Sequence, residues 1–158
     1  MQLRLKYVPE PANAPRFAAD VVASAAKIND VTLDYGVESL VAVDAIMDAL
    51  RADGVSIKQI AETLFGFGCY VGEVLVRNSS ASWRTPNKQE LEWFGWPLVV
   101  SAGEQNVSNP IGKVFKRFEN GDEDNLRYFY GVFARAGERA AERQTAEDGE
   151  QAAQVEQE

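Results

Sequence analysis

One apolar segment, residues 57–77, constrains the fold of this chain more than any other. Ser56 and Gln59 form a capping-box pair at its start, which is a sequence signature of a helix N-terminus. Apolar side chains then recur at three- and four-residue spacing, the period of an α-helix. A helix that is apolar over such a broad arc is normally covered by other elements. The sequence therefore predicts a central helix over residues 57–77.

The same segment contains three glycines, Gly66, Gly68 and Gly72. Each glycine in a helix interior costs about 1 kcal/mol relative to alanine, so a structural reason is expected for keeping them. Two interpretations stay open, and both depend on the absence of a Cβ atom. A neighbouring helix or sheet packs closely against this face, or the face is the floor of a groove that admits a ligand or a partner.

Four further helices and a small sheet are expected around this central helix. Apolar periodicity predicts helices over about 14–28, 35–53, 110–120 and 123–136. Alternation predicts a short strand over 3–7, and short aromatic and β-branched runs predict two or three antiparallel strands between 81 and 103. Because strands and helices are segregated along the chain, the predicted class is α+β, with about five helices and an antiparallel sheet of two to four strands.

The 158 residues are expected to form one globular domain and a tail. The globular α+β domain is predicted to span residues 1–136. Residues 137–158 are rich in Ala, Glu and Gln, and they carry seven acids and two arginines without an apolar stripe. Such a composition is typical of a solvated helical extension or of a disordered segment, and both alternatives stay open.

The residue inventory argues against catalysis, because the chain has no histidine and only one cysteine, Cys69. Histidine is the usual acid/base group near neutral pH and the commonest metal ligand. Cys69 lies within an apolar helix, where packing is expected rather than reactivity. We therefore expect a protein that is not an enzyme, with no catalytic residue, no metal and no cofactor.

The charge of the chain limits the kinds of partner that it is expected to bind. The net charge is −8, of which the tail contributes −5, so no basic surface for nucleic acid is expected and a basic protein partner is favoured.

The first residues lack the apolar core of a secretory signal, and no apolar run is long enough to cross a membrane. A single cysteine suits a reducing compartment. We expect a cytoplasmic protein, and the sequence gives no prediction of its oligomeric state.

Six residues form the predicted binding surface. Glu73 and Arg77 have the spacing of a helical ion pair, and aromatic residues between 83 and 96 exceed what one sheet face can bury. Tryptophan and arginine are favoured anchors of protein interfaces. The alternative is ordinary structure: an ion pair at the edge of the core, and core tryptophans. The predicted surface consists of Glu73, Arg77, Trp83, Arg84, Trp93 and Trp96.

Another group of charges, Lys113, Lys116 and Arg117, is interpreted as the solvated face of a helix. Three basic residues on an acidic protein are too few to indicate a phosphate-binding site.

Three stretches together support a resemblance to a known group of proteins. They are the Tyr-x-Gly-Glu helix in 68–75, the tryptophan segment 81–84, and the Asn-Pro-x-x-Lys-Val segment that opens 109–126. The combination resembles small uncharacterised bacterial proteins, some of which are similar to immunity proteins of contact-dependent or type VI secretion toxin systems. The resemblance covers about residues 60–130. It implies a protein that neutralises a toxin by occluding it, and it implies no catalytic residue.

Two rivals to this interpretation are defined by what each requires. A small-molecule binding or sensing module requires a pocket beside the glycine-rich helix, at Gly68, Gly72 and Trp83. An enzyme requires Glu73, Tyr70 and Arg77 to converge on a cleft. A flat or convex face at these positions favours protein binding.

Overall fold

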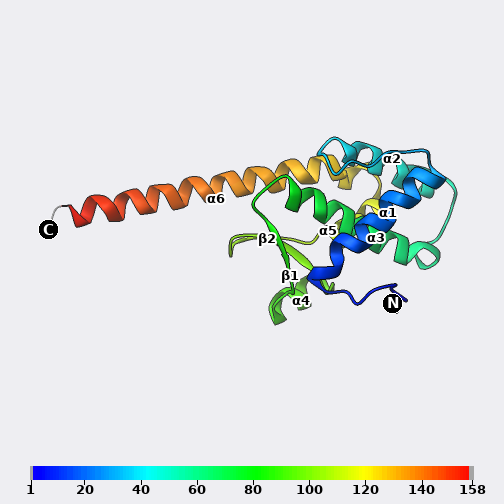
Figure 1. The fold of residues 1–158 in the computed structure, drawn as a ribbon, viewed down its shortest axis with the longest axis horizontal. Coiled ribbons are helices and arrows are strands. Elements are labelled where there is room, and N and C mark those ends of the chain that lie inside the picture. The colour runs from blue at the N-terminus through cyan, green and yellow to red at the C-terminus, as the bar shows by residue number, and fades with distance from the viewer. Residues whose placement is uncertain (1, 157–158) are drawn as a thin grey trace.

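The computed structural model of the chain describes residues 2–156 and has an α+β fold, with six α-helices and a three-stranded antiparallel sheet in that range (Figure 1). The elements follow one another as a 3₁₀ turn at Pro11–Asn13, α1 (Ala14–Ile28), α2 (Ser39–Ala52), α3 (Ile57–Arg77), β1 (Ser82–Arg84), α4 (Lys88–Phe94), β2 (Val99–Ala102), β3 (Asn106–Ser108), α5 (Pro110–Asn120), a 3₁₀ turn at Asp122–Asp124, and α6 (Leu126–Val155). The predicted fold class is confirmed.

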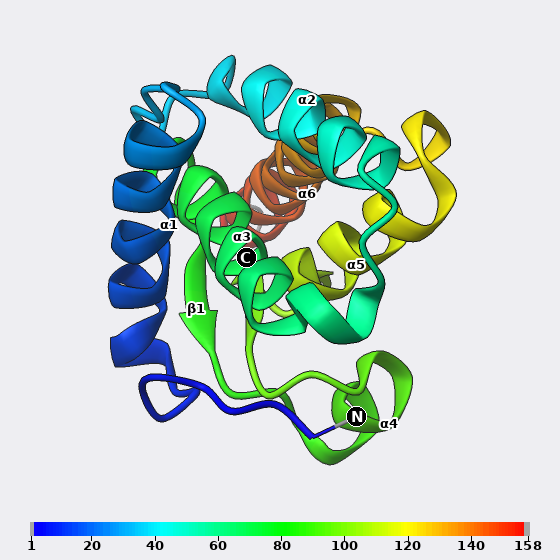
Figure 2. The same cartoon turned by 90° about the vertical axis from the view of Figure 1, so that its right-hand side faces the viewer.

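The central helix is confirmed, with the predicted bounds. At its start, Gln59 N donates to Ser56 Oγ at 3.3 Å and Ser56 N donates to Gln59 Oε1 at 2.8 Å, so the capping box is complete. Every residue from 64 to 75 is buried. Viewed along the length of the molecule, α3 lies between α1 and α5, with α2 along a third side (Figure 2).

The glycines of α3 allow its neighbours to approach closely. A Cβ on Gly68 would lie 2.5 Å from the Cα of Ile111 in α5, and a Cβ on Gly72 would lie 2.1 Å from the Trp83 ring. A Cβ on Gly66 would lie 2.7 Å from a methyl group of Val21 in α1. The close-packing interpretation is therefore confirmed. The groove interpretation is wrong at Gly68 and Gly72, because α5 and Trp83 fill the space beside them.

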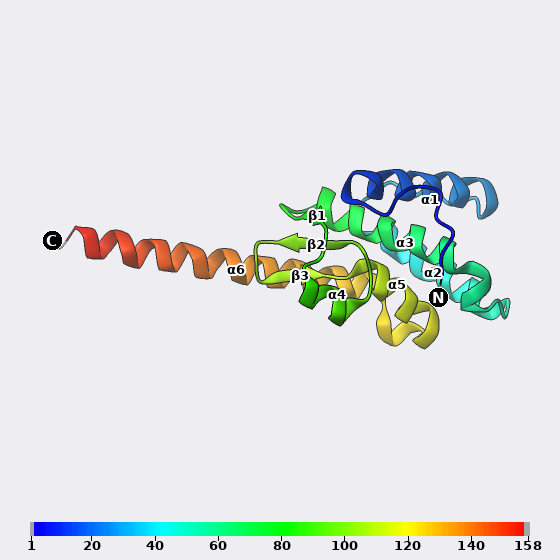
Figure 3. The same cartoon turned by 90° about the horizontal axis from the view of Figure 1, so that it is seen from below.

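The sheet has the order β1-β2-β3, and its register pairs Trp83 with Val100 and Val100 with Ser108. Val100 packs with Leu75 at the end of α3 and with Phe133 of α6 in a small second core cluster. The sheet therefore joins the C-terminal end of the central helix to the last helix. Figure 3 shows β2 and β3 beside α6, where that helix leaves the body of the molecule.

Two sequence expectations for strands are wrong. Residues 3–7 form no strand, although Leu3, Leu5 and Tyr7 are half-buried against the core as their alternation indicated. A strand needs a partner for its backbone groups. This segment instead uses Arg4 N to donate a hydrogen bond to Glu62 Oε1 at 3.0 Å.

The second correction is α4, a helix within the segment 81–103, where only strands were expected. Two of the two or three expected strands, β1 and β2, are present there, and β3 lies beyond the segment. Asn87 and Glu90 form a second capping box: Glu90 N donates to Asn87 Oδ1 at 2.8 Å, and Asn87 N donates to Glu90 Oε1 at 2.9 Å. The helix ends at Gly95, whose φ of 73° lies in the left-handed region that glycine adopts without strain. As a result, Trp83 is the one tryptophan in the sheet, while Trp93 lies on α4 and Trp96 follows it.

Through Val155, the predicted tail is helical rather than disordered, and its residues 157 and 158 lie outside the described part of the chain. Helix α6 has 30 residues, which corresponds to a length of about 45 Å. Asn125 caps it by accepting a hydrogen bond from Tyr128 N at 2.9 Å, so the helix begins at Leu126, three residues after the predicted start at 123. Residues 138–156 are all exposed, and the helix extends away from the body of the protein (Figures 1 and 3).

Candidate functional site

The six residues of the predicted surface do not form one site. Glu73, Arg77 and Trp83 meet at the C-terminal end of α3, Arg84 binds α4, Trp96 enters the core, and Trp93 points into solvent. Their separate roles follow from their contacts.

Glu73 is a buried carboxylate, and each of its two oxygens accepts a hydrogen bond. It is 4% exposed, accepts a hydrogen bond from Trp83 Nε1 at Oε2 (3.0 Å), and accepts one from Arg77 Nη2 at Oε1 (3.3 Å). The Arg77 guanidinium also lies 3.6 Å from the centre of the Tyr35 ring, a cation–π arrangement. This group fixes the Trp83 ring against Gly72 at the edge of the core.

Tyr70 does not join Glu73 and Arg77 at a common cleft. Its hydroxyl oxygen lies 2.6 Å from Ser39 Oγ and accepts a hydrogen bond from Tyr35 N at 3.0 Å. Burial raises the pKa of the Tyr70 hydroxyl, and burial together with the charge of Glu73 raises the pKa of the Cys69 thiol. Both groups are therefore held in their neutral forms, and their contacts are those of packed side chains.

Trp96 belongs to the core. Its ring centroid lies 4.6 Å from that of Phe115 in α5 and 6.2 Å from that of Phe65 in α3. This packing holds the chain directly after Gly95, so it fixes the C-terminal end of α4 to the body of the protein.

A second contact fixes α4 from the sheet. Arg84 on β1 donates two parallel hydrogen bonds to the Glu90 carboxylate, each of 2.7 Å, and its Nε donates to Ser101 Oγ on β2 at 3.1 Å. Bidentate arginine–carboxylate pairs are among the strongest side-chain hydrogen bonds, and they fix orientation. We call α4 together with Arg84 the α4 platform.

The Arg84–Glu90 pair predicts a pH dependence. The hydrogen bonds from Arg84, followed by the one from Asn87 N, lower the pKa of Glu90 from 4.5 to about 2. Because the pKa is lower in the folded state, the pair contributes stability above pH of about 4.5 and loses it as the pH falls toward 2. Urea unfolding should therefore show wild type more stable than Glu90→Gln at neutral pH, with the difference shrinking between these values.

The matched control is Glu92→Gln, a substitution of an exposed glutamate in the same helix. A stability difference between wild type and Glu90→Gln that stays constant from pH 7 to pH 2.5 would contradict the assignment.

The α4 platform holds an apolar patch, defined by exposed Leu91 and Trp93 and half-buried Phe94. Trp93 is 68% exposed, Leu91 is 48% exposed, and the rings of Trp93 and Phe94 pack edge to face with centroids 6.4 Å apart. Most large apolar side chains are buried in a folded protein, and an exposed tryptophan is one of the features that mark contact surfaces. Trp96 holds one end of α4 and Arg84 holds its side, so this apolar patch lies on a helix that is fixed in position.

Beside the platform, the outer surface of the sheet is hollowed and polar. A hollow of about 550 Å³ is lined by Ser82, Arg84, Asn87, Glu90 and Ser101, among others. A wider groove of about 770 Å³ follows between the β2–β3 turn and α6, with Glu104, Glu138 and Glu147 in its walls. The two hollows share Ser80, Gly103 and Glu104, so one continuous surface leads from α4 to the acidic helix.

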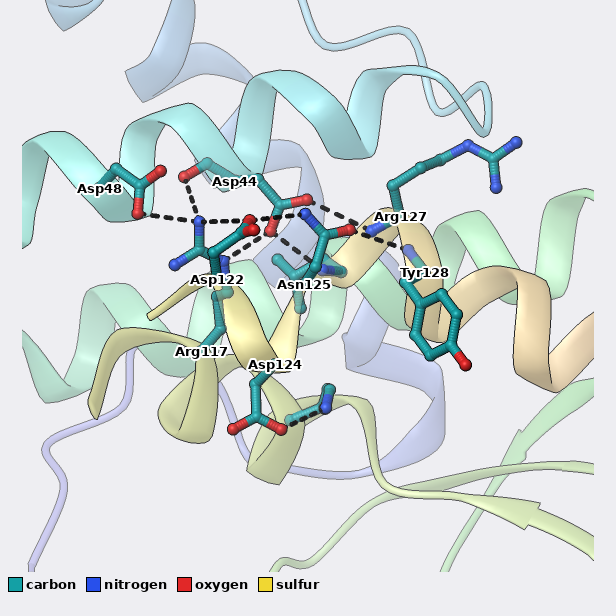
Figure 4. Close-up of polar contacts among 10 residues, drawn as sticks. Asp44, Asp48, Arg117, Asp122, Asp124, Asn125, Arg127 and Tyr128 are labelled. Carbon is teal, nitrogen blue, oxygen red and sulfur yellow. Dashed lines mark hydrogen bonds and ion pairs between the residues drawn. The ribbon is translucent and has the colours of Figure 1, made fainter. Parts of the chain in front are cut away.

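A buried charged cluster was missed by sequence reasoning (Figure 4). Arg117 of α5 is 0% exposed, and its Nε donates to Asp44 Oδ1 at 2.8 Å while its Nη2 donates to Asp48 Oδ1 at 2.9 Å. Asp44 also accepts from Leu126 N at 2.9 Å and from Arg127 N at 3.3 Å. The cluster therefore joins α2, α5 and the first turn of α6.

The interpretation of Arg117 as part of a solvated basic face is wrong, because its side chain is fully buried. Burial disfavours the charge on Arg117, but the hydrogen bonds with Asp44 and Asp48 outweigh it and raise the pKa of the guanidinium. A signal was present: Asp44 lies four residues after Leu40, and Arg117 lies three after Val114, so each occupies an apolar stripe.

No family model matches the chain, and comparison with curated proteins and with solved structures gives no significant match. Over residues 2–156, no helix is both long and apolar enough to cross a lipid bilayer. In the same range, no three acidic or cysteine side chains are grouped as metal ligands would be.

Proposed function

We infer that this protein is a non-catalytic binding protein, and that it presents the α4 platform to a protein partner. The observation that carries this proposal is Trp93, a largely exposed tryptophan on a helix held in place by Arg84 and Trp96. Tryptophan is enriched among the few residues that dominate the binding energy of interfaces.

Rigidity of the platform supports the same conclusion. Binding costs free energy when side chains and loops must become ordered at the interface. Two hydrogen bonds from Arg84 and the capping box of Asn87 and Glu90 already fix α4 in the free protein. An exposed apolar patch that is held in place in this way is ready to be covered by a partner.

Charge supports a basic partner. The net charge is −8, and residues 137–158 contribute −5 of it, from seven acids and two arginines. An acidic helix that projects from the body attracts a positively charged protein and raises its association rate. With the resemblance to immunity proteins, the specific form of the proposal is a cytoplasmic antidote that occludes a basic bacterial toxin.

The test is co-purification from the organism that encodes the chain, with the recovered proteins identified by mass spectrometry. Wild type should recover a basic protein, and Trp93→Ser should lower the affinity for that protein about tenfold or more, because a central aromatic anchor is lost. The control is Tyr128→Ser, since Tyr128 is 66% exposed at the start of α6 and lies outside the platform.

Both variants should keep the melting temperature of wild type. The proposal fails if wild type recovers no protein partner, or if the recovered partner binds Trp93→Ser and wild type equally well. The specific form is supported if the recovered partner is toxic and if wild type, but not Trp93→Ser, abolishes that toxicity.

A further inference from the structure

The groove between the β2–β3 turn and α6 lies where that helix leaves the body of the protein, and it has a volume of about 770 Å³ (Figure 3). On the side of α6 it is lined by Phe133 and by three short residues, Ala134, Gly137 and Ala141. The short residues follow one another at spacings of three and four, so they share one face of the helix. The groove therefore has an apolar floor along this face of α6.

The walls of the groove are acidic. Glu104 lies on the β2–β3 turn, and Glu138 and Glu147 lie on α6. Arg143 is the one basic residue among the described lining residues, so three acids and one arginine give the walls a net charge of −2. Within residues 2–156, the side chains of the three glutamates take part in no hydrogen bond or ion pair. Their negative charge is therefore available to a ligand.

The two glutamates of α6 flank the apolar floor from opposite sides. Glu138 and Glu147 are nine residues apart, which corresponds to about two and a half helical turns and about 14 Å along the axis. Glu104 lines the same groove from the turn. An extended chain rises about 3.3 Å per residue, so a ligand that reaches all of these carboxylates is a segment of at least four residues.

An apolar floor between acidic walls suits long basic side chains. Lysine and arginine place their aliphatic stems along apolar surface and keep the charged end group in water at the edge. The end group of an arginine can in addition donate two parallel hydrogen bonds to one carboxylate. An acidic segment would instead meet like charge on both sides of the groove.

We propose that this groove binds an extended, basic segment of the protein partner, with lysine or arginine side chains lying along the floor and meeting Glu104, Glu138 and Glu147. The inference rests on the proposed function and deepens it, since the groove continues into the hollow beside the α4 platform through Ser80, Gly103 and Glu104. Trp93 then supplies the apolar anchor, and the groove selects partners that carry a basic segment next to the surface that covers α4.

A hexa-arginine peptide with blocked ends is the probe, titrated into the isotopically labelled full chain at low ionic strength and followed by NMR. Amide signals of the β2–β3 turn and of residues 133–147 should shift together and saturate. Free arginine, which offers one side chain, should bind about tenfold more weakly or worse, because it meets one carboxylate at a time. Binding of free arginine as tight as that of the peptide, or no binding of the peptide, would overturn the proposal.

A triple variant tests the location. Glu104→Gln, Glu138→Gln and Glu147→Gln together should weaken binding of hexa-arginine about fivefold or more, as expected for the loss of three exposed ion pairs. All three residues are exposed, so the melting temperature should stay that of wild type.

The matched control changes the net charge by the same amount outside the groove. It combines Glu142→Gln, Glu150→Gln and Glu156→Gln, three exposed positions of α6 and its end that do not line the groove. This control should weaken binding about twofold or less, because only the long-range attraction is reduced. Equal weakening by the two triple variants would show diffuse attraction to the acidic helix and would overturn the proposal.

Trp93→Ser separates this inference from the proposed function. It should bind hexa-arginine like wild type, because Trp93 does not line the groove. The groove triple variant should in turn bind the co-purified partner less tightly than the control triple variant does. If partner binding depends on Trp93 but is the same for the two triple variants, the inference about the groove fails and the α4 platform stands. If the groove variant alone loses the partner and Trp93→Ser keeps it, the α4 platform fails and the groove stands.

Discussion

Replacement of Asp44 by alanine is expected to lower the free energy of unfolding by about 3–5 kcal/mol, a large part of the stability of an ordinary domain. Asp44 is the carboxylate that pairs with the fully buried Arg117, at 2.8 Å from its Nε. Removal of one partner leaves a buried guanidinium without full compensation, which is much more costly than the loss of an exposed pair. Urea unfolding at neutral pH, followed by tryptophan fluorescence, measures the loss.

Asp48→Ala is the matched control for this prediction. Asp48 contacts the same guanidinium at 2.9 Å, but its side chain is 57% exposed, so its loss should cost about 1 kcal/mol or less. If Asp48→Ala destabilises the protein as much as Asp44→Ala, the burial of each aspartate does not determine how much stability its removal costs, and the prediction is wrong.

A double variant separates the two roles of Asp44. Asp44→Leu combined with Arg117→Met removes both buried charges and should recover much of the stability lost in Asp44→Ala. Leu126 N and Arg127 N would still lack the acceptor that Asp44 provides in the first turn of α6. The part that is not recovered, together with faster hydrogen exchange in that turn, measures how far Asp44 fastens the projecting helix to the body.

The Asp44–Arg117 pair is a feature that local signals in the sequence could not predict. Periodicity and capping signals predicted the bounds of α3 and the start of α5 at Asn109-Pro110, because these signals are local. The charge of Arg117 favours a position at the surface, and no local signal in the sequence is strong enough to oppose it. Its burial depends on Asp44, 73 residues away in the chain, and such a pairing is a property of the tertiary structure.

Helix α4 and the residues around it illustrate a different limit. Seven residues rich in aromatic side chains favour a strand by propensity, and the Asn87–Glu90 capping box was the local signal for a helix. The Glu73–Arg77 pair could be predicted from its four-residue spacing. The contact of Glu73 with Trp83 could not be predicted, because it requires the sheet to fold back onto α3. For the same reason, the sequence could not assign Trp96 to the core and Trp93 to the surface.

Gly68→Ala is expected to lower the free energy of unfolding by about 1–3 kcal/mol, although alanine is the better helix former by about 1 kcal/mol. The new Cβ would lie 2.5 Å from the Cα of Ile111, so α5 itself would have to move. Backbone cannot yield as the end of a flexible side chain can, and a close-packed core transmits the displacement. Urea unfolding measures the loss.

Gly131→Ala in α6 provides a control of opposite sign. A Cβ at Gly131 would meet one atom, Arg135 Nη1, at the ordinary contact distance of 3.6 Å. The same substitution should therefore stabilise the protein there, by up to about 1 kcal/mol, through helix propensity alone. If Gly68→Ala is neutral or stabilising as well, α5 does not pack directly on the glycine face of α3. Opposite signs for one chemical change in two helices would show that contact with α5, rather than helix propensity, requires glycine at position 68.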